Sequence, residues 1–271
     1  MPELPEVETT LNGLSPYLLN NTITNIVVRN EKLRKPITPY FVNQLKKSRI
    51  ISLERKAKYI ITKIDSGYWI SHLGMSGSLS FHQANTPYLK HDHLIIDFDK
   101  GPQLRYNDPR RFGFHEYTPC LSDLKYLNHL GLEPLDDAFN PNDFYRLTSQ
   151  SNRPIKSFIM DQKIVVGVGN IYATEALFLS QINPETPARN ISKAQLKTLI
   201  DHIKECLETA IKLGGTTLRD FVNPDKKSGY FQQTLKVYGK LNQPCPICKT
   251  TIQSVKINQR ASAFCPLCQP L

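Results

Sequence analysis

Residues 59–73 read Tyr59-Ile60-Ile61-Thr62-Lys63-Ile64-Asp65-Ser66-Gly67-Tyr68-Trp69-Ile70-Ser71-His72-Leu73. Two runs of β-branched and aromatic residues, at 59–64 and 68–73, flank a polar turn, and this pattern predicts two short strands. Five further runs of this kind are found at 23–28, 50–53, 79–81, 94–98 and 112–117. Several short strands without intervening helices predict an antiparallel sandwich or barrel, of which we expect the β-sandwich.

Helical spacing is found on both sides of this β region. An apolar stripe from Val7 to Leu18 predicts a first helix that Pro16 kinks or stops. Beyond residue 154, two helices at 154–160 and 171–179 flank a glycine-rich loop. Ser192 and Gln195 form a capping box for a longer helix that ends at Gly214-Gly215. Its predicted buried stripe is Leu196, Leu199, Ile200, Ile203, Leu207 and Ile211.

These patterns predict an α+β protein of two domains. The N-terminal β-sandwich domain, with its N-terminal helix, covers residues 1–131. A linker with one short helix near 143–147 follows at 132–153. The helical domain covers 154–234 and carries an exposed loop at 217–230, and a four-cysteine unit occupies 235–271.

The charge of the chain is basic and unevenly distributed. The 271 residues carry a formal net charge of +10, which favours a polyanionic partner. Asp225 is the last acidic residue, and seven basic residues follow it: Lys226, Lys227, Lys236, Lys240, Lys249, Lys256 and Arg260. No uninterrupted apolar run approaches the ~18 residues of a membrane span, and no basic amphipathic helix is evident. We therefore expect a cytoplasmic protein that binds nucleic acid rather than a membrane.

Two Cys-x2-Cys pairs stand near the C-terminus, Cys245 with Cys248 and Cys265 with Cys268. Four thiolates at this spacing suit one tetrahedral Zn²⁺, and four protein ligands make the ion structural. Disulfides are the alternative, which a cytosolic location disfavours. The intervening residues 256–263 are predicted to form a hairpin with Arg260 near its tip.

The N-terminus offers a nucleophile beside a proton carrier. Removal of Met1, which the small Pro2 permits, leaves a secondary amine next to Glu3. An α-amino group titrates near ~8 and a lysine near ~10.4, so the terminus offers roughly a few hundred times more free amine at neutral pH. Attack on a sugar C1′ would give a charged iminium, which withdraws electrons from the adjacent C–H bond. The alternative is an ordinary helix start, where Pro and acidic residues are favoured.

For four other residues, the sequence allows both a structural and a functional interpretation. Met75 lies between glycines and Phe112 lies in an arginine-containing turn; either side chain belongs to a core or forms a wedge that unstacks bases. Lys58 is a surface lysine or a cation that reaches into a site. Asn170 is a helix cap, which the residues alone favour, or a phosphate ligand.

Taken together, these segments resemble bacterial formamidopyrimidine-DNA glycosylase. The resemblance runs in order through Pro2-Glu3-Leu4-Pro5-Glu6-Val7-Glu8-Thr9, Lys58, 72–77, Asp108-Pro109-Arg110-Arg111-Phe112-Gly113, 167–172, 214–217 and the four cysteines. Leu4 and the Asp108-to-Gly113 motif favour this family over its pyrimidine-directed relative, endonuclease VIII. One departure is Lys249, where the family usually has a small residue.

The resemblance implies a bifunctional DNA glycosylase and AP lyase of base-excision repair. Its duplex DNA substrates contain oxidised purines, namely 8-oxoguanine and formamidopyrimidines. Pro2 is then the nucleophile that forms a Schiff base, Glu3 is the acid/base, and β,δ-elimination follows. Lys58 contacts phosphate and the lesion region, and Arg260 grips phosphate on the zinc hairpin; both belong to the implied catalytic set.

The same resemblance implies a DNA interface. Met75, Arg110 and Phe112 fill the vacated stack, with Arg110 facing the orphaned cytosine. The further implied DNA contacts are His91, Lys156, Asn170 and Arg260. The helical region becomes a helix-two-turns-helix domain, and the loop at 217–230 covers the flipped base. We expect one structural Zn²⁺, no redox cofactor, a monomer, and a bacterial cytoplasmic location with nucleoid association through DNA.

Two other functions compete with this hypothesis. A non-catalytic DNA-binding zinc protein would keep the scaffold without the chemistry, but Pro2, Glu3 and Lys58 are all present. A related glycosylase would act on oxidised pyrimidines. The three hypotheses differ in whether the protein forms a covalent adduct with DNA, and in whether that DNA carries an oxidised purine or an oxidised pyrimidine.

Overall fold

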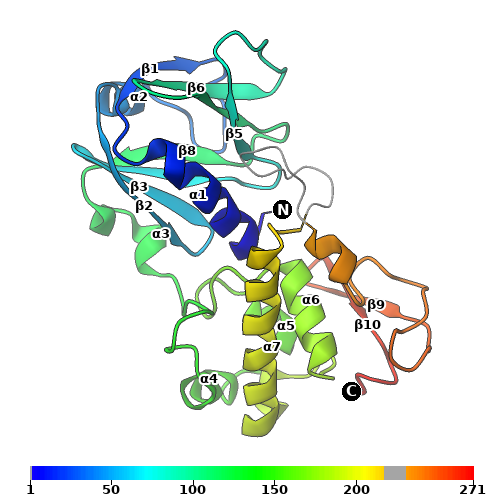
Figure 1. Ribbon diagram of the computed structural model, residues 1–271. Helices are drawn as coiled ribbons and strands as arrows, with labels where there is room; N and C mark the ends of the chain where they lie inside the picture. Colours follow the sequence, from blue (N-terminus) through cyan, green and yellow to red (C-terminus); the bar gives the residue numbers. More distant parts are fainter. Residues whose placement is uncertain (1, 217–229) are drawn as a thin grey trace. The chain divides into compact units, whose positions relative to one another are not determined.

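The computed structural model describes residues 2–216 and 230–271, and the chain divides into two compact units (Figure 1). The first unit holds residues up to Asn128 and the described part of Ile211–Gln232, and the second holds His129–Ala210 and Gln233–Leu271. The predicted domain boundaries stay predictions. Within the described ranges, no helix is long and apolar enough to cross a membrane.

The first unit contains two four-stranded antiparallel sheets. One sheet has the order β1-β6-β7-β5, with β1 (Ile23–Val28), β5 (Ser78–His82), β6 (Asp92–Phe98) and β7 (Gln103–Asn107). The other has the order β2-β3-β4-β8, with β2 (Ile50–Lys56), β3 (Tyr59–Ile64), β4 (Gly67–His72) and β8 (Phe114–Thr118). The predicted antiparallel sandwich is therefore confirmed.

Strand β7 was not predicted, because two of its buried residues are Gln103 and Arg105, which a pattern of hydrophobicity scores as exposed. Strand β8 begins two residues later than predicted. Phe112 and Gly113 belong to the turn before it instead.

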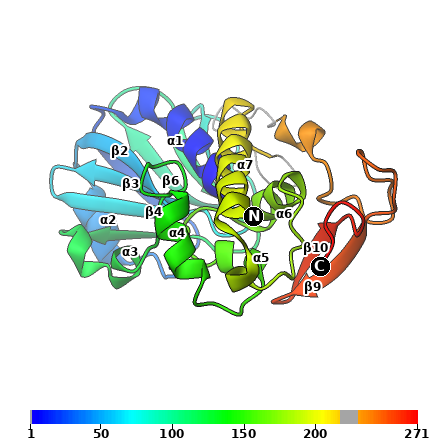
Figure 2. The same cartoon turned by 90° about the horizontal axis from the view of Figure 1, so that it is seen from below.

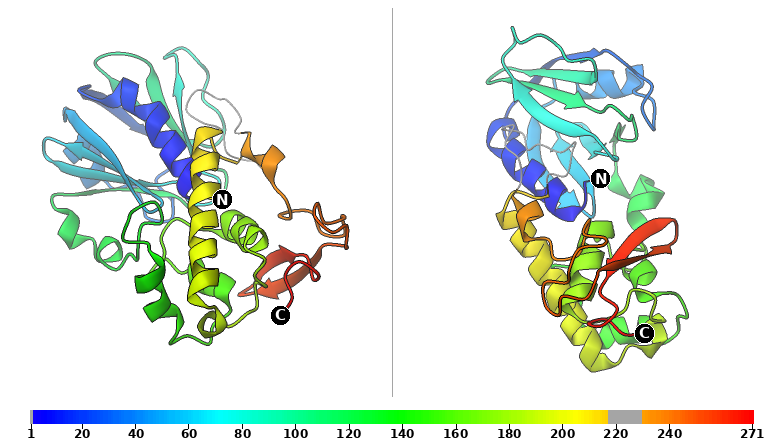
Figure 3. Two further views of the ribbon diagram at one scale, coloured as in Figure 1. Left: turned by 60° about the horizontal axis from the view of Figure 1, so that its bottom comes forward. Right: turned by 90° about the vertical axis from the view of Figure 1, so that its right-hand side faces the viewer.

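Helix α1 (Leu4–Leu18) buries Leu4, Val7, Leu11, Leu14 and Leu18. All of these except Leu4 join the core between the sheets, to which both sheets contribute apolar side chains. Figure 3 shows α1 beside β2 and β3, which it contacts. The helix continues through Pro16 and ends at Leu18, so Pro16 does not stop it, and the predicted alternative of a kink stays a prediction. Proline in a last turn removes only its own N–H bond, and burial of Leu18 favours that turn.

Two short helices and one 3₁₀ turn also belong to the first unit. Helix α2 (Pro39–Leu45) begins after Thr38, whose hydroxyl accepts the Phe41 N–H at 3.2 Å, and it buries Phe41 and Leu45. The turn η1 (Leu121–Asp123) precedes α3 (Lys125–Asn128). None of these was predicted, because pieces this short carry little periodicity.

The second unit is mainly helical. It contains α4 (Pro141–Thr148), α5 (Ile155–Ile159), η2 (Ala188–Asn190), α6 (Asn170–Leu179) and most of α7 (Lys193–Lys212), with η3 (Phe231–Thr234) at its boundary in sequence. The Ser192–Gln195 capping box is present, with both reciprocal hydrogen bonds, and it confirms the predicted start of α7. The buried stripe of α7 also takes Cys206 and Ala210, whereas Ile211 is only half-buried.

The chain ends in a hairpin of β9 (Gln253–Ile257) and β10 (Arg260–Phe264). Its two turn residues, Asn258 and Gln259, both have positive φ (45° and 62°), as type I′ hairpin turns require. Figure 2 shows this hairpin beside α6, which contacts β10. Arg260 follows the turn directly, as predicted.

A buried carboxylate joins α6 to the segment ahead of the cysteines. Glu175 accepts the N–H groups of Lys236, Val237 and Tyr238 at 2.7, 3.0 and 2.7 Å. Val237 then packs in a small core with Phe178, Cys245, Ile252 and Cys265. The cysteine unit is thereby fixed to the helix that begins with Asn170.

Candidate active site and nucleic-acid interface

Pro2 and Glu3 are buried directly before α1. Glu3 is the N-cap, and its N–H donates to Glu6 Oε2 at 2.8 Å in a reciprocal capping box. The other oxygen of Glu6 accepts the Thr216 N–H at 2.7 Å. One buried carboxylate therefore fixes the backbone beside Pro2 and the backbone at residue 216. The helix start also stabilises negative charge at this position.

The backbone approaches Glu6 closely at Gly215. A Cβ at Gly215 would lie 3.1 Å from Glu6 Oε1, and the residue has a φ of +82° that favours glycine. The predicted lesion-covering loop at 217–230 lies outside the described residues except for Tyr230. Met1, whose removal the sequence hypothesis requires, also lies outside them.

Lys58 lies half-buried in the two-residue turn between β2 and β3, after Ala57, which has a φ of +55°. Arg55 ties this turn to α1, because its Nε donates to Glu8 Oε2 at 2.6 Å and its Nη1 donates to the Ala57 carbonyl at 3.0 Å. The turn that carries Lys58 is therefore braced against the helix that begins after Glu3.

Met75 and the pair Arg110 and Phe112 lie on two turns that pack together. A Cβ at Gly74, in the Met75 turn, would lie 2.3 Å from the Gly113 nitrogen and from the Phe112 carbonyl carbon. Met75 is half-buried, while Phe112 is 45% exposed with the Arg110 guanidinium 5.1 Å from its ring centre. The three predicted wedge residues are thus brought onto one structural feature.

His72 precedes the Met75 turn and holds it, because His72 Nδ1 accepts the Gly74 N–H at 3.1 Å. Burial, together with Arg34, Lys58 and Lys35, lowers the pKa of His72 to about 4. The imidazole is therefore neutral at physiological pH, which its role as an acceptor requires.

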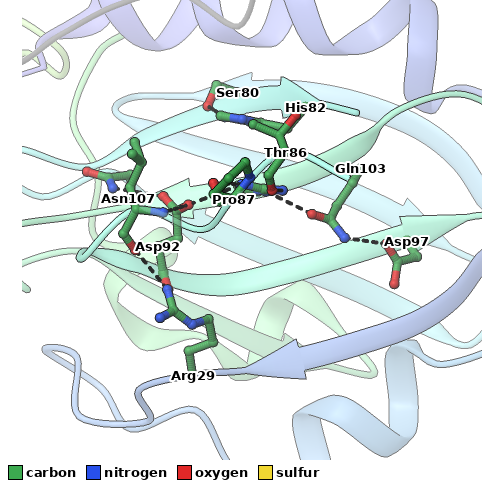
Figure 4. A network of polar contacts seen from close by, with 11 residues as sticks. Arg29, Ser80, His82, Thr86, Pro87, Asp92, Asp97, Gln103 and Asn107 are labelled. Atoms are coloured by element: carbon green, nitrogen blue, oxygen red, sulfur yellow. Dashed lines mark hydrogen bonds and ion pairs between the residues drawn. The ribbon is translucent and has the colours of Figure 1, made fainter. Parts of the chain in front are cut away.

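His91 ends the 83–91 loop and is half-buried, with its ring centre 5.9 Å from that of His93. A buried network holds this loop (Figure 4). The fully buried Arg105 donates to the carbonyls of Thr86 at 2.7 Å and Pro87 at 3.0 Å, and it lies 3.5 Å from the Asp92 carboxylate. Asp92 also accepts the Leu89 N–H at 2.8 Å.

In the second unit, Lys156, Asn170 and Arg260 lie around the hairpin. Lys156 is buried; its Nζ donates to Ser262 Oγ at 2.8 Å and to the Ala261 carbonyl at 3.3 Å. The Asn170 amide donates to the same carbonyl at 3.2 Å. The N-cap of α6 is Gly169, so the expectation that Asn170 caps the helix was wrong. Its side chain contacts the hairpin instead.

A cavity of about 230 Å³ lies between α5 and the hairpin turn, lined by Arg153, Lys156, Asp161 and Arg260 among others. Arg153 is paired with Asp161 at 2.9 Å. Arg260 is exposed at the start of β10. Three cations against one carboxylate give this cavity a positive charge that suits a phosphate group.

The four cysteine sulfurs all lie within 4.8 Å of one another. Individual Sγ–Sγ separations are 3.9 Å for Cys245–Cys268, 3.4 Å for Cys248–Cys265 and 3.5 Å for Cys248–Cys268. A tetrahedral ion with ~2.3 Å zinc–sulfur bonds separates its ligands by about 3.8 Å. The residues present therefore fit one Zn²⁺.

Comparison with known proteins accounts for both units. The family model for the formamidopyrimidine-DNA glycosylase N-terminal domain matches residues 1–115, and that for the formamidopyrimidine-DNA glycosylase H2TH domain matches 130–222. A zinc finger found in FPG and IleRS matches 242–271. A formamidopyrimidine-DNA glycosylase of Psychromonas ingrahamii is 50% identical, covering 99% of this chain and all of the relative. The chain belongs to the formamidopyrimidine-DNA glycosylase family.

Solved structures of the formamidopyrimidine-DNA glycosylase family share the fold over the full length. A Lactococcus lactis FPG variant in complex with Fapy-dG-containing DNA matches with a TM-score of 0.92 at 33% identity, and all of both chains is covered. The MutM (FPG) protein of Thermus thermophilus matches with a TM-score of 0.87 at 34% identity, covering 99% of this chain and 98% of that one. The predicted fold class and the structural Zn²⁺ site are thus both confirmed.

Several residues that shape the candidate site were not predicted as site residues. Glu6 was part of the N-terminal motif but was given no role of its own, although it accepts the Thr216 N–H. Arg105 bonds to the Thr86 and Pro87 carbonyls, and Asp108 bonds to Ser76 as well as to the nearby Tyr106 and Gly113. The Asp108-Pro109 pair is a local signal for a turn, but no local pattern indicates which donors its carboxylate meets.

Proposed function

We propose that this chain is a bifunctional DNA glycosylase and AP lyase that excises oxidised purines, 8-oxoguanine and formamidopyrimidines, from duplex DNA. The observation that carries the proposal is the buried Pro2–Glu3 pair, whose backbone Glu6 holds at the start of α1. Family relatives bound to DNA with Fapy-dG or an abasic site support the same substrate class.

The chemistry follows from a free Pro2 amine. Its nitrogen forms a bond to C1′ while the N-glycosidic bond breaks, and the base leaves with the bonding electron pair and takes up the proton that the ammonium formed at Pro2 releases. Glu3 delivers a proton to the ring oxygen as the sugar opens, which leaves an iminium between Pro2 and C1′. The iminium acidifies C2′–H, so loss of that proton expels the 3′ phosphate; a second elimination expels the 5′ phosphate.

The basic residues then serve as DNA contacts. Lys58 and Arg260 neutralise phosphates near the lesion, and Asn170 and His91 contact the backbone nearby. Lys156 supports phosphate binding from a buried position, through the hairpin carbonyl that it shares with Asn170. Met75, Arg110 and Phe112 fill the space that the flipped base vacates, with Arg110 facing the orphaned cytosine.

A strand-cleavage assay tests the proposal. With a labelled duplex carrying 8-oxoguanine opposite cytosine, we expect fragments that end in phosphate on both sides of a one-nucleotide gap. Glu3→Gln removes the proton carrier and is expected to lower the rate by about 10²-fold or more. The matched control is Glu54→Gln, the same change at an exposed residue of β2. Intact strands with the wild-type protein, at concentrations where the duplex is bound, would refute the proposed activity.

A related glycosylase for oxidised pyrimidines is the second candidate. One solved complex of the Lactococcus lactis FPG contains DNA with an oxidised pyrimidine, so that family member binds such DNA. The same assay with an oxidised-pyrimidine duplex separates the two readings. Faster cleavage of the purine lesion supports the first, and faster cleavage of the pyrimidine lesion supports the second.

A further inference from the structure

We propose that Asp108 is a positioning residue whose buried carboxylate locks the Met75 turn and the Arg110–Phe112 turn into one rigid wedge. The inference rests on the proposed function, because it concerns how the wedge enters the duplex. It assigns a task to a residue that contacts neither the reacting atoms nor, by its complete burial, the DNA.

The carboxylate of Asp108 accepts three hydrogen bonds from three segments. Its Oδ1 accepts the Ser76 hydroxyl at 2.5 Å, and its Oδ2 accepts the Tyr106 hydroxyl at 2.8 Å and the Gly113 N–H at 2.9 Å. Ser76 directly follows Met75, Tyr106 lies on β7, and Gly113 closes the turn that contains Arg110 and Phe112. Both turns are therefore tied to one fixed point in the sheet.

The backbone groups around Asp108 complete the lock. Ser76 Oγ, which donates to the carboxylate, also accepts the Arg110 N–H at 3.1 Å. The Asp108 N–H donates to the His91 carbonyl at 3.1 Å, and His93 Nε2 lies 2.8 Å from the Asp108 carbonyl oxygen. His91, a proposed DNA contact, is thus held by the same residue.

Glycines allow the two turns to close on this carboxylate. A Cβ at Gly113 would lie 1.9 Å from the Tyr106 hydroxyl, and one at Gly77 would lie 2.6 Å from it. Gly74 has a φ of +67° and packs against the Phe112–Gly113 peptide. The close packing leaves no room for the turns to move independently while the Asp108 hydrogen bonds are intact.

Such a lock matters at the step in which a base leaves the stack. A wedge that is ordered before binding loses less conformational entropy when it enters the duplex than one that must order its turns there. Asn at position 108 keeps one acceptor oxygen but directs an N–H₂ group toward a donor, so the lock loosens while the shape is nearly kept. The loss should therefore fall on base extrusion and spare the chemistry at C1′.

The first test compares two duplexes under single-turnover conditions. One carries 8-oxoguanine opposite cytosine, whose base must be unstacked, and the other carries an abasic site, which has no base to extrude. We expect Asp108→Asn to lower the rate at least 10-fold more on the first duplex than on the second. Ser76→Ala, which removes one donor and keeps the carboxylate, should give the same pattern with a smaller amplitude. Equal losses on both duplexes would overturn the proposal.

The second test measures, without DNA, how firmly the Arg110–Phe112 turn is held. Trypsin cleaves after Arg110 and Arg111, which are exposed in the turn, and we expect cleavage to be at least 10-fold faster in Asp108→Asn. Asp123→Asn, the same change at an exposed residue of the same unit, is the control. An unchanged cleavage rate in Asp108→Asn would overturn the proposal, and Ser76→Ala decides the question should that variant fail to fold.

The two tests separate this inference from the proposed function. If the wild-type protein processes neither duplex but trypsin cleaves the variant faster, the activity is wrong and the lock stands. If the wild-type protein processes both duplexes and Asp108→Asn resembles it in both assays, the activity stands and the lock is wrong.

Discussion

Lys249 has an unusual backbone conformation for a residue with a long side chain. Lys249 follows the first cysteine knuckle with a φ of +65°, a conformation that glycine adopts without steric penalty. Its N–H donates to the Cys245 carbonyl at 3.0 Å, so the turn geometry at the zinc corner is kept. Lys249 therefore keeps the turn, but its backbone is strained because a lysine replaces the small residue that the family usually has there.

Replacing Lys249 by glycine should relieve this strain. We expect Lys249→Gly to stabilise the zinc-bound corner by about 0.5–1 kcal/mol, which tightens apparent zinc affinity about 2- to 5-fold. Competition with a chromophoric chelator measures the affinity. Lys236→Gly, the same change without a positive φ, is the control and should not tighten binding. Unchanged or weaker affinity in Lys249→Gly would show that the turn is not strained.

At the scale of elements, buried polar side chains fix the loops that carry the proposed DNA contacts. Arg105 on β7 and Asp92 on β6 together hold the 83–91 loop, which ends in His91. A buried charge left without its partner is strongly destabilising, so each member depends on the other.

Arg105→Leu should therefore lower the free energy of unfolding of the first unit. We expect a loss of about 3–5 kcal/mol in the free energy of unfolding, because Asp92 stays buried without its cation. Arg29→Leu is the matched control: Arg29 donates to the Leu89 and Asp92 carbonyls but is exposed, and its loss should cost about 1 kcal/mol or less. Urea unfolding followed by tryptophan fluorescence compares the two. Similar losses would contradict a special role for the buried pair.

Two histidines of the same sheet should make the first unit sensitive to acid. Burial lowers the pKa of His115 to about 3, and burial with nearby cations lowers that of His72 to about 4. The unfolded chain binds these protons near pH 6.5, so below that pH it holds more protons than the folded chain. Stability is therefore complete above about pH 6.5 and is lost as the pH falls toward 3 to 4.

The contribution of His115 can be isolated by substitution. Its Nδ1 lies 2.9 Å from the Ser71 hydroxyl and 3.2 Å from Trp69 Nε1, inside the core. Between pH 6 and 4, we expect the free energy of unfolding to fall less steeply in His115→Gln than in the wild type, by about 1.4 kcal/mol per pH unit. Urea titrations at several pH values give both slopes. Parallel slopes would mean that His115 titrates alike in both states.

The elements that the sequence predicted best are those with strong local patterns. Seven strands, α1 and α7 follow from periodicity and capping residues alone. Strand β7 was missed because Gln103 and Arg105 are polar but buried, with Gln103 bonded to Asp97 and Arg105 bonded to the Thr86 and Pro87 carbonyls. Helix α1 passes Pro16 because core packing outweighs one lost bond. Tertiary contacts decide these cases, and they leave no trace in local spacing.

At the scale of the whole molecule, a net charge of +10 predicts DNA binding that depends steeply on salt. The logarithm of the association constant should fall with that of the salt concentration, with a slope of roughly −0.9 per phosphate neutralised. Arg260→Ala should reduce this slope by about 1. Lys197→Ala, which removes an exposed lysine paired with Asp201, should leave it unchanged. An affinity that does not respond to salt would contradict a phosphate-dominated interface.

The candidate site was predictable where chemistry is carried by residue type and spacing. The four cysteines were identified from their spacing, and Pro2, Glu3 and the wedge residues were named as candidates from the sequence and its family resemblance. Glu6, Arg105 and Asp108, which fix the backbone of nearby segments, were not, because each bonds to a group distant in the sequence: the Thr216 N–H, the Thr86 carbonyl and the Ser76 hydroxyl. Asn170 was misread as a cap because its partner, the Ala261 carbonyl, lies 91 positions away in the chain.

The most direct test of the central claim is borohydride reduction of the protein mixed with a duplex that carries 8-oxoguanine opposite cytosine, followed by mass mapping of the cross-link. We predict a reduced covalent adduct on the Pro2 nitrogen, which requires that Met1 has been removed. Trapping on an oxidised-pyrimidine duplex but not on this one would favour the second candidate function. No adduct with a free Pro2 and a bound duplex would contradict the account and leave a DNA-binding protein without catalysis.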